Sequence, residues 1–98
     1  MEKQTPHCTL AEVRALVALG KVRATRSARL GATELGLDIA GMLAVVMALT
    51  TTDFYKSMTT HADATIWQDV YRPNTPVGDV YLKLTVIDDV LVVSFKGL

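Results

Sequence analysis

The sequence GDVYLKLTVIDDVLVVSFKGL, residues 78–98, decides the fold. Within it, two runs rich in valine, isoleucine and leucine, residues 80–87 and 90–95, are separated only by Asp88 and Asp89. A two-residue gap of turn-tolerant residues is typical of a β-hairpin. The stretch is therefore predicted to form two antiparallel strands joined by a tight turn.

The register of this hairpin follows if Ile87 faces Val90, because side chains along a strand alternate between the two faces of a sheet. The predicted pairs on one face are all apolar: Val86–Leu91, Leu84–Val93 and Leu82–Phe95. The predicted pairs on the other face are Thr85–Val92, Lys83–Ser94 and Tyr81–Lys96. Directly opposed Cβ atoms lie about 4.5–5.5 Å apart, so Tyr81 and Lys96 are expected to be neighbours on a face turned away from the core. A lysine at a strand end is more often only a solubilising residue, so the pair alone does not establish a site.

The sequence upstream of residue 53 has the apolar spacing of helices. Thr9 followed by Glu12 is a capping-box pattern and predicts a first helix at about residues 10–19. A second helix is predicted within residues 26–36, and Asp38 is expected to cap a third helix through residues 39–49.

Further strands are predicted at residues 53–59 and 66–72, ahead of the hairpin. The 98 residues are enough for a single domain, residues 1–98. We therefore predict an α+β fold with about three N-terminal helices packed on one face of a mainly antiparallel sheet.

A second register follows if residues 73–76, PNTP, form a four-residue loop and Arg72 faces Val77. Gln68 then lies opposite Tyr81, so that Gln68, Tyr81 and Lys96 lie abreast on three adjacent strands. The same register places Asp69 on the apolar face, which is a mild objection to it, and a slip of one residue would send Gln68 to the core.

The composition argues against several kinds of site. Cys8 is the only cysteine, and His7 and His61 are isolated from each other, so no disulfide, metal site or cofactor is expected. The N-terminus MEKQTPHC lacks an apolar signal segment, and the longest apolar run is too short to span a bilayer. These features predict a cytoplasmic protein with no membrane partner.

The charge is balanced overall but uneven along the chain. Ten basic and ten acidic residues give a net charge of zero, yet residues 1–31 hold six basic and only two acidic ones. The segment KVRATRSAR supplies the main basic cluster, and its Arg23 and Arg26 are candidates for contacts with an RNA backbone. Overall neutrality argues against tight non-specific binding of nucleic acid.

Several blocks of this sequence resemble the motility quorum-sensing regulator (MqsR) toxin family: DFYKSMTT, IWQDVYRP and VYLKLTVIDDVLVVSFK, with TPH, TRSA and ELGLD. The resemblance runs over essentially the whole chain. It implies a RelE-like fold and the toxin of a bacterial type II toxin-antitoxin system. The implied activity is metal-independent cleavage of messenger RNA at GC-containing triplets such as GCU. It also implies a partner antitoxin resembling MqsA, which holds the toxin inactive and represses the shared operon.

Carried over by this resemblance, the catalytic residues of the family fall on Lys56, Gln68, Tyr81 and Lys96. The strand registers place three of these four side by side. Arg72 is a further candidate, by analogy with the arginines that RelE-like sites aim at the scissile phosphate. Tyr55 and Met58 are candidates for contacts with a base, although an aromatic residue or a methionine in a strand more often belongs to a core.

Metal-free RNA cleavage requires a base for the 2′-OH, an acid for the 5′-oxygen and positive charge at the phosphate. Two lysines held close together disfavour each other's charged form, so either Lys56 or Lys96 is a possible base while the other acts as an acid or a cation. His61 is a rival base. The alternative to an enzyme is a degenerate toxin that only binds its antitoxin.

Overall fold

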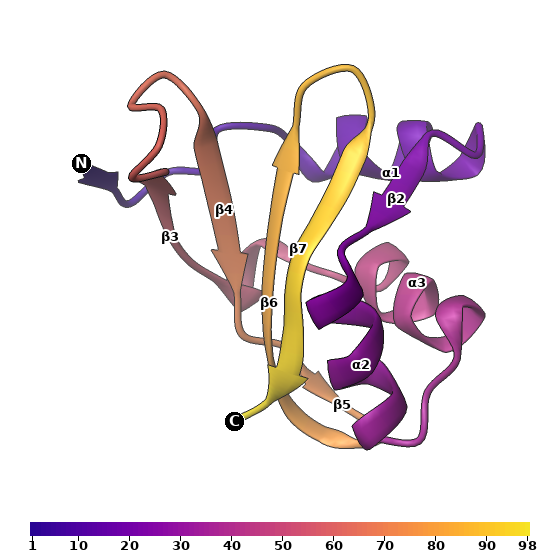
Figure 1. Ribbon diagram of the computed structural model, residues 1–98. Helices are drawn as coiled ribbons and strands as arrows, with labels where there is room; N and C mark the ends of the chain where they lie inside the picture. The colour runs from indigo at the N-terminus through magenta and orange to yellow at the C-terminus, as the bar shows by residue number, and fades with distance from the viewer.

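The computed structural model describes residues 1–98 and interleaves helices with strands in its N-terminal half (Figure 1). The elements are β1 (Glu2–Lys3), α1 (Leu10–Ala18), β2 (Val22–Ala24), α2 (Arg26–Glu34), α3 (Ile39–Met47), the 3-10 turn η1 (Thr51–Asp53), β3 (Phe54–Thr59), β4 (Trp67–Tyr71), β5 (Asn74–Thr75), β6 (Gly78–Val86) and β7 (Val90–Gly97). The α+β class is confirmed. The helices do not form an uninterrupted N-terminal block, because β1 precedes α1 and β2 lies between α1 and α2 in the chain.

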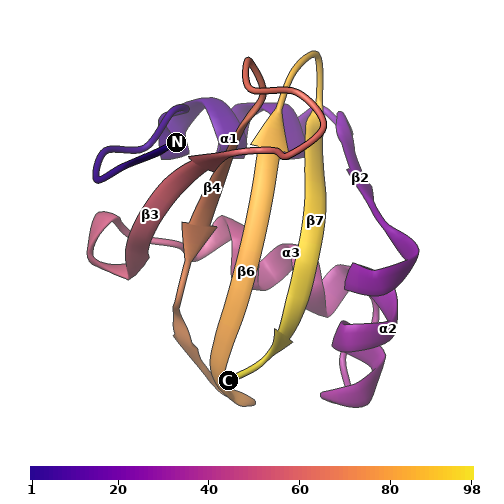
Figure 2. The ribbon, with the colours of Figure 1, turned by 60° about the vertical axis from the view of Figure 1, so that its left-hand side comes forward.

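The seven strands form one twisted sheet in the order β1-β3-β4-β6-β7-β2, with β5 paired to β6 (Figure 2). All strand pairs are antiparallel except β2 with β7, which is parallel. The predicted, mainly antiparallel sheet is confirmed, and the short strands β1 and β2 are its two edges.

Each helix begins at a side chain that accepts a backbone hydrogen bond. Thr9 accepts from Glu12 at 3.2 Å, Thr25 from Ala28 at 3.1 Å and Asp38 from Gly41 at 2.7 Å. These contacts satisfy amide groups that have no partner inside the helix. The predicted caps of the first and third helices are confirmed.

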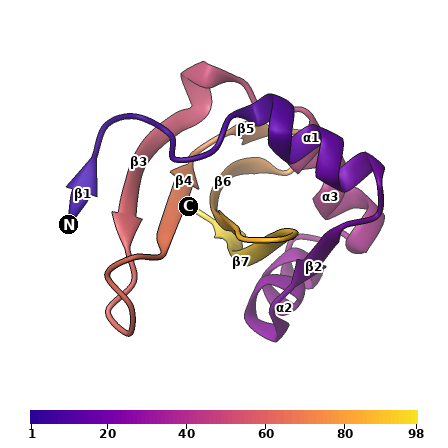
Figure 3. The ribbon, with the colours of Figure 1, turned by 90° about the horizontal axis from the view of Figure 1, so that it is seen from above.

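The core lies between α1, α3 and one face of the sheet (Figure 3). It includes Val13 of α1, Met42 and Val46 of α3, and Leu82 and Phe95 of the central strands, all at most 1 % exposed. Helix α2 lies along the lower half of β7 and adds Ala28 and Ala32 to the core (Figure 1). The face of the sheet away from α1 and α3, named here the open face, is not covered by a helix (Figure 2).

No single helix is long and apolar enough to cross a membrane. Together, α2 and α3 have the length and composition of a span, but they are bent by 94° relative to each other.

The hairpin register is as predicted at the end far from the turn and wrong near it. Tyr81 pairs with Lys96 and Lys83 pairs with Ser94, as expected. A β-bulge then shifts the register by one residue, so that Leu84 pairs with Val92 and not with Val93. Val92 is consequently buried in the core, whereas Val93 is half-buried and has no partner in β6.

The cause of this shift lies in the turn. Two-residue hairpin turns need positive φ angles, which asparagine and glycine adopt most readily. No residue other than glycine has a positive φ here, so Asp88 and Asp89 do not make such a turn. Ile87 joins them in a three-residue loop and is 67 % exposed, against the prediction that it ends a strand.

The register between β4 and β6 also differs from the prediction. Tyr71 pairs with Leu82 and Val70 with Lys83, which brings Gln68 level with Thr85 and not with Tyr81. The segment after β4 does not loop at once: β5 pairs with β6 as far as Thr75 and Gly78, and Gly78 has a φ of +100°. Because the turn comes later in the chain than predicted, each residue of β4 pairs four positions farther along β6. An even shift keeps side chains on the same face, so the predicted face of Gln68 is right and its predicted neighbour is wrong.

Asp69 lies on the core side of the sheet, as the predicted register implied. Its charge on the apolar face had been a mild objection to that register. It is 2 % exposed, and its carboxylate accepts hydrogen bonds from the backbone of His7 at 3.0 Å and Cys8 at 3.1 Å and from Ser57 Oγ at 2.6 Å. A buried carboxylate is tolerated when such donors surround it. Asp69 therefore ties the segment before α1 to the sheet.

Candidate active site

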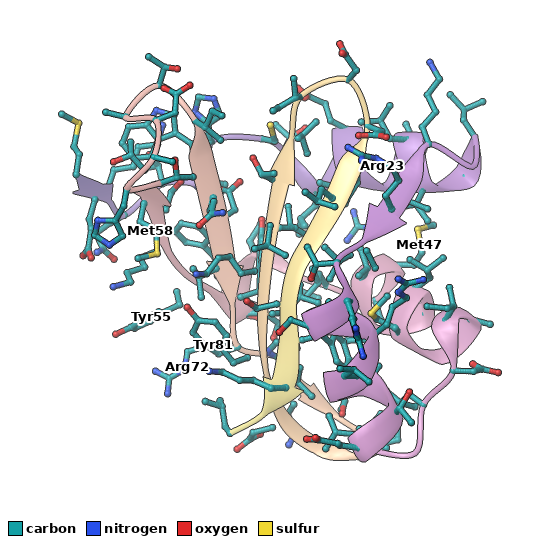
Figure 4. All side chains as sticks on the ribbon, viewed as in Figure 1. Arg23, Met47, Tyr55, Met58, Arg72 and Tyr81 are labelled. Carbon is teal, nitrogen blue, oxygen red and sulfur yellow. The ribbon has the colours of Figure 1, made fainter.

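The open face carries a group of basic and aromatic side chains where β3, β4, β6 and β7 come together. Tyr55 of β3, Tyr81 of β6 and Arg72, which directly follows β4, lie near one another there (Figure 4). With the neighbouring lysines they form what we call the basic-aromatic cluster: Tyr55, Lys56, Arg72, Tyr81, Lys83 and Lys96. The cluster offers four positive charges and two phenol groups on one surface.

Tyr81 occupies the middle of the cluster. Lys96 Nζ lies 5.2 Å from the centroid of its ring, and Lys83 Nζ lies 6.0 Å from the same point. Arg72 comes level with Tyr81 on the other side, because the amide of Val80 donates to the carbonyl of Pro73 at 3.0 Å and so continues the β4–β6 register. The predicted Tyr81–Lys96 contact is thus part of a larger group.

Lys83 was missed as a site residue by the sequence prediction. The hairpin register had placed it on the same face as Tyr81, two residues along the strand, and that spacing was the available signal. Val70 separates Lys83 from Lys56 across the sheet and is fully buried. We attribute this burial to the lysine stems, which can cover apolar surface while their charged ends reach solvent.

A β-bulge positions the aromatic side of the cluster. The register of β3 shifts between Phe54 and Lys56, which leaves Tyr55 as the extra residue. Bulges redirect side chains in this way, and they are frequent beside active sites. Tyr55 is 45 % exposed, and the guanidinium carbon of Arg72 lies 4.7 Å from the centroid of its ring.

Lys56 differs from the other lysines because a carboxylate already binds it. Its Nζ lies 2.9 Å from Glu2 Oε2, and β1 brings Glu2 to this place by pairing with β3. The hydrogen bond that Lys56 donates to Glu2 raises the pKa of Lys56, and the same contact lowers the pKa of Glu2. Lys56 is therefore a fixed positive charge at neutral pH.

The comparison with known protein families agrees with the resemblance found in the sequence. The family model described as motility quorum-sensing regulator, toxin of MqsA, matches residues 5–97. The chain belongs to this toxin family. It is also 64 % identical over 96 residues to the mRNA interferase toxin MqsR of Escherichia coli strain K12, with 98 % of each chain covered.

In this member of the MqsR family, Gln68 and Met58 do not join the basic-aromatic cluster. They pair with each other across β3 and β4 on the open face. Gln68 is level with Thr85, four residues along β6 from Tyr81, which corresponds to about 13 Å of strand. The rival base His61 is farther still, in the loop between β3 and β4.

The two arginines predicted to bind RNA have different surroundings. Arg26 lines a groove of about 510 Å³ between α2 and β7, together with Lys96. Arg23 is bound to Asp89, with Nε and Oδ2 2.7 Å apart, and this ion pair lowers the pKa of Asp89. Arg26 can therefore extend the positive surface of the cluster, whereas the charge of Arg23 is already paired.

No group of three or more histidine, cysteine, aspartate and glutamate side chains lies close enough together to hold a metal ion. The chemistry that the cluster can supply by itself is that of ammonium, guanidinium and phenol groups.

Proposed function

We propose that the chain is an mRNA interferase toxin, an endoribonuclease that cleaves RNA at the basic-aromatic cluster without a metal ion. The name of its 64 % identical relative, an mRNA interferase toxin, supports the activity. The observation that supports the site is the contact of Tyr81 with two lysines at 5.2 and 6.0 Å on an uncovered face of the sheet.

The proposed reaction moves two protons. The 2′-oxygen attacks the neighbouring phosphorus as it loses its proton, the bond from phosphorus to the 5′-oxygen breaks, and that oxygen gains a proton. The products are a 2′,3′-cyclic phosphate and a 5′-hydroxyl. Lys56 remains charged because of Glu2, so we assign it to the phosphate, whose negative charge it stabilises.

Proton transfer is then assigned to Tyr81 and Lys96, which lie within reach of one another. Arg72 is suited to hold a phosphate oxygen, because its guanidinium is always charged and presents a rigid fork of donors. Gln68 and Met58 are assigned to a flanking nucleotide, since they lie on the same face but farther along the sheet.

The finer properties proposed for this chain come from its family. They are a RelE-like fold, a preference for GC-containing triplets such as GCU, action in the cytoplasm, and inhibition by an antitoxin that resembles MqsA. The family description, which names the toxin of MqsA, supports the last of these.

The test is cleavage of a GCU-containing RNA by the purified protein in excess EDTA. We expect cleavage to persist, and we expect Lys96→Ala and Tyr81→Phe each to reduce its rate by roughly 10²–10⁴-fold. Lys21→Ala removes an exposed charge from outside the cluster and is the matched control. Mass spectrometry should find the cyclic phosphate.

Loss of cleavage in EDTA that Mg²⁺ or Zn²⁺ restores would overturn the metal-free mechanism. A protein that binds its antitoxin but cleaves no RNA under any condition would instead be the degenerate toxin considered from the sequence.

A further inference from the structure

A pocket of about 460 Å³ adjoins the basic-aromatic cluster at the lower end of the open face. Tyr55 and Arg72 belong to both the cluster and the pocket, and Asn74 and Asp79 also line it. Neither Asn74 nor Asp79 has a part in the proposed proton transfers. The question is what ligand these four side chains suit.

Tyr55 and Arg72 offer flat surfaces. The tyrosine ring is 45 % exposed, and the planar guanidinium lies over it at 4.7 Å. Unpaired RNA bases are held in this manner, by stacking on aromatic rings or on arginine. A planar heterocycle is therefore the ligand that this side of the pocket fits.

Asp79 supplies a fixed acceptor beside those surfaces. It lies two residues before Tyr81 on β6, so both side chains are on the open face. Asn74 pairs with Asp79 across β5 and β6, and its Nδ2 donates to Asp79 Oδ1 at 2.8 Å. This hydrogen bond orients the carboxylate and leaves Oδ2 and a second lone pair of Oδ1 for a ligand.

An ionised carboxylate only accepts hydrogen bonds, and it can accept two from adjacent donors. Among the four RNA bases, guanine alone has two adjacent donors, N1–H and the N2 amino group, on its Watson–Crick edge. Adenine and cytosine have a donor beside an acceptor, and uracil has one donor between two acceptors. The carboxylate would repel those acceptors.

We infer that this pocket is a guanine-binding subsite in which the base stacks on the Tyr55–Arg72 pair and Asp79 accepts from its Watson–Crick edge. The subsite deepens the proposed function and rests on it, because it would hold a nucleotide next to the scissile phosphate. It makes Asp79 and its partner Asn74 specificity-determining residues.

The experiment measures binding separately from cleavage. Pentanucleotides that carry 2′-O-methyl groups throughout cannot be cleaved, because they lack the attacking hydroxyl. Each has pyrimidines around a central guanine, 7-deazaguanine, hypoxanthine or adenine, and binding is followed by fluorescence anisotropy. Hypoxanthine lacks only the N2 amino group, whereas 7-deazaguanine keeps the whole Watson–Crick edge.

We expect the wild-type protein to bind the guanine and 7-deazaguanine RNAs equally, and the hypoxanthine RNA about tenfold or more weakly, since one hydrogen bond to a charged group is lost. Asp79→Asn should reduce the preference for guanine over hypoxanthine to about twofold or less. Asp88→Asn makes the same charge change in the exposed β6–β7 loop and should keep the preference. Tyr55→Leu should weaken all four RNAs alike.

The subsite is overturned if the wild type binds guanine and hypoxanthine RNAs equally, or if Asp79→Asn keeps the preference while its circular dichroism matches the wild type. Cleavage of the corresponding all-ribose RNAs separates the two proposals. Guanine preference without cleavage would overturn the proposed function alone. Cleavage without any dependence on Asp79 would overturn the subsite alone.

Discussion

Lys56 shows how one neighbour decides the role of a side chain. From the sequence, Lys56 and Lys96 were equivalent candidates for the general base. The contact with Glu2 at 2.9 Å separates them, because it raises the pKa of Lys56 and keeps the ammonium charged. The β1 strand that brings Glu2 is two residues long, which is too short for strand alternation to predict.

Replacing Glu2 tests this role. Glu2→Gln should lower the pKa of Lys56 and strengthen RNA binding several-fold, because a carboxylate that competes with phosphate is removed; the effect should shrink at high salt. Glu12→Gln on α1, which packs on the other face of the sheet, is the control. The measurement is anisotropy with uncleavable RNA at low and high salt. Equal affinities for the two variants would show that Glu2 does not restrain Lys56.

Tyr71 provides a prediction about pH. Its ring is fully buried and packs edge-on against Phe54 at 5.5 Å, while its hydroxyl has no hydrogen-bond partner. Burial raises the pKa of Tyr71 from 10.0 to about 12. Between those values the unfolded chain loses this proton while the folded chain keeps it, so stability falls as the pH rises through this window.

At pH 7, the free energy of unfolding of Tyr71→Phe should therefore equal that of the wild type or exceed it by up to about 1 kcal/mol. The reason is that the substitution removes a buried hydroxyl without a partner. Its free energy of unfolding should also fall less steeply between pH 10 and 12. Urea unfolding at pH 7, 10 and 11 measures both effects, with Tyr55→Phe as the exposed control. A large loss of stability at pH 7 would mean that the hydroxyl makes a favourable contact.

At the scale of elements, the sequence predicted which segments pair but not every register. The Tyr81–Lys96 pair was predicted from a two-residue turn, but the loop has three residues, and the β-bulge between Lys83 and Leu84 restores the predicted register from Lys83 back to Val80. The errors arose at the turns. Alternation says nothing about whether a loop takes two residues or three, and each extra residue moves the partners that follow it.

The close contact of α2 with β7 depends on Gly31. A Cβ at this position would lie 1.7 Å from the carbonyl oxygen of Phe95. Alanine favours a helix over glycine by about 1 kcal/mol, but here the clash must push α2 away from the strand that carries Lys96. Helix propensity and packing therefore oppose each other at this residue.

We expect the clash to win, so that Gly31→Ala lowers the free energy of unfolding by about 1–3 kcal/mol. Ser27→Ala, at an exposed position of the same helix, should leave stability unchanged or slightly increased. Urea unfolding of both variants at pH 7 is the measurement. A stabilised Gly31→Ala would show that α2 can shift without loss.

Over the whole molecule, few basic side chains are available to bind RNA phosphates. The net charge is zero, Arg23 is paired with Asp89, and Lys56 already contacts Glu2. The basic residues left around the site are Arg26, Arg72, Lys83 and Lys96. Of the basic residues expected from the sequence to contact RNA, Arg23 is therefore removed, and Lys83 is added.

With Lys56 included, at most about five phosphate contacts are possible, and each contributes about 0.7 to the salt slope for single-stranded RNA. We expect the logarithm of affinity to change by less than about 4 per decade of salt. A titration of the Lys96→Ala protein with uncleavable RNA, compared with the wild type, measures this slope. A slope near 7 would mean that the remaining basic surface of residues 1–31 also binds RNA.

The parallel pairing of β2 with β7 has a consequence for the time at which the protein becomes active. Thr25 follows β2, and its hydroxyl donates to the carbonyl of Val93, 68 positions later in the chain. At synthesis rates of about 5–20 residues per second, a nascent chain waits roughly 3–14 s for this partner. Lys96 joins Tyr81 only when the same late strand has been made. A ribosome translating this chain therefore completes almost the whole domain before the proposed site can assemble, and we expect the incomplete chain not to cleave the message that encodes it.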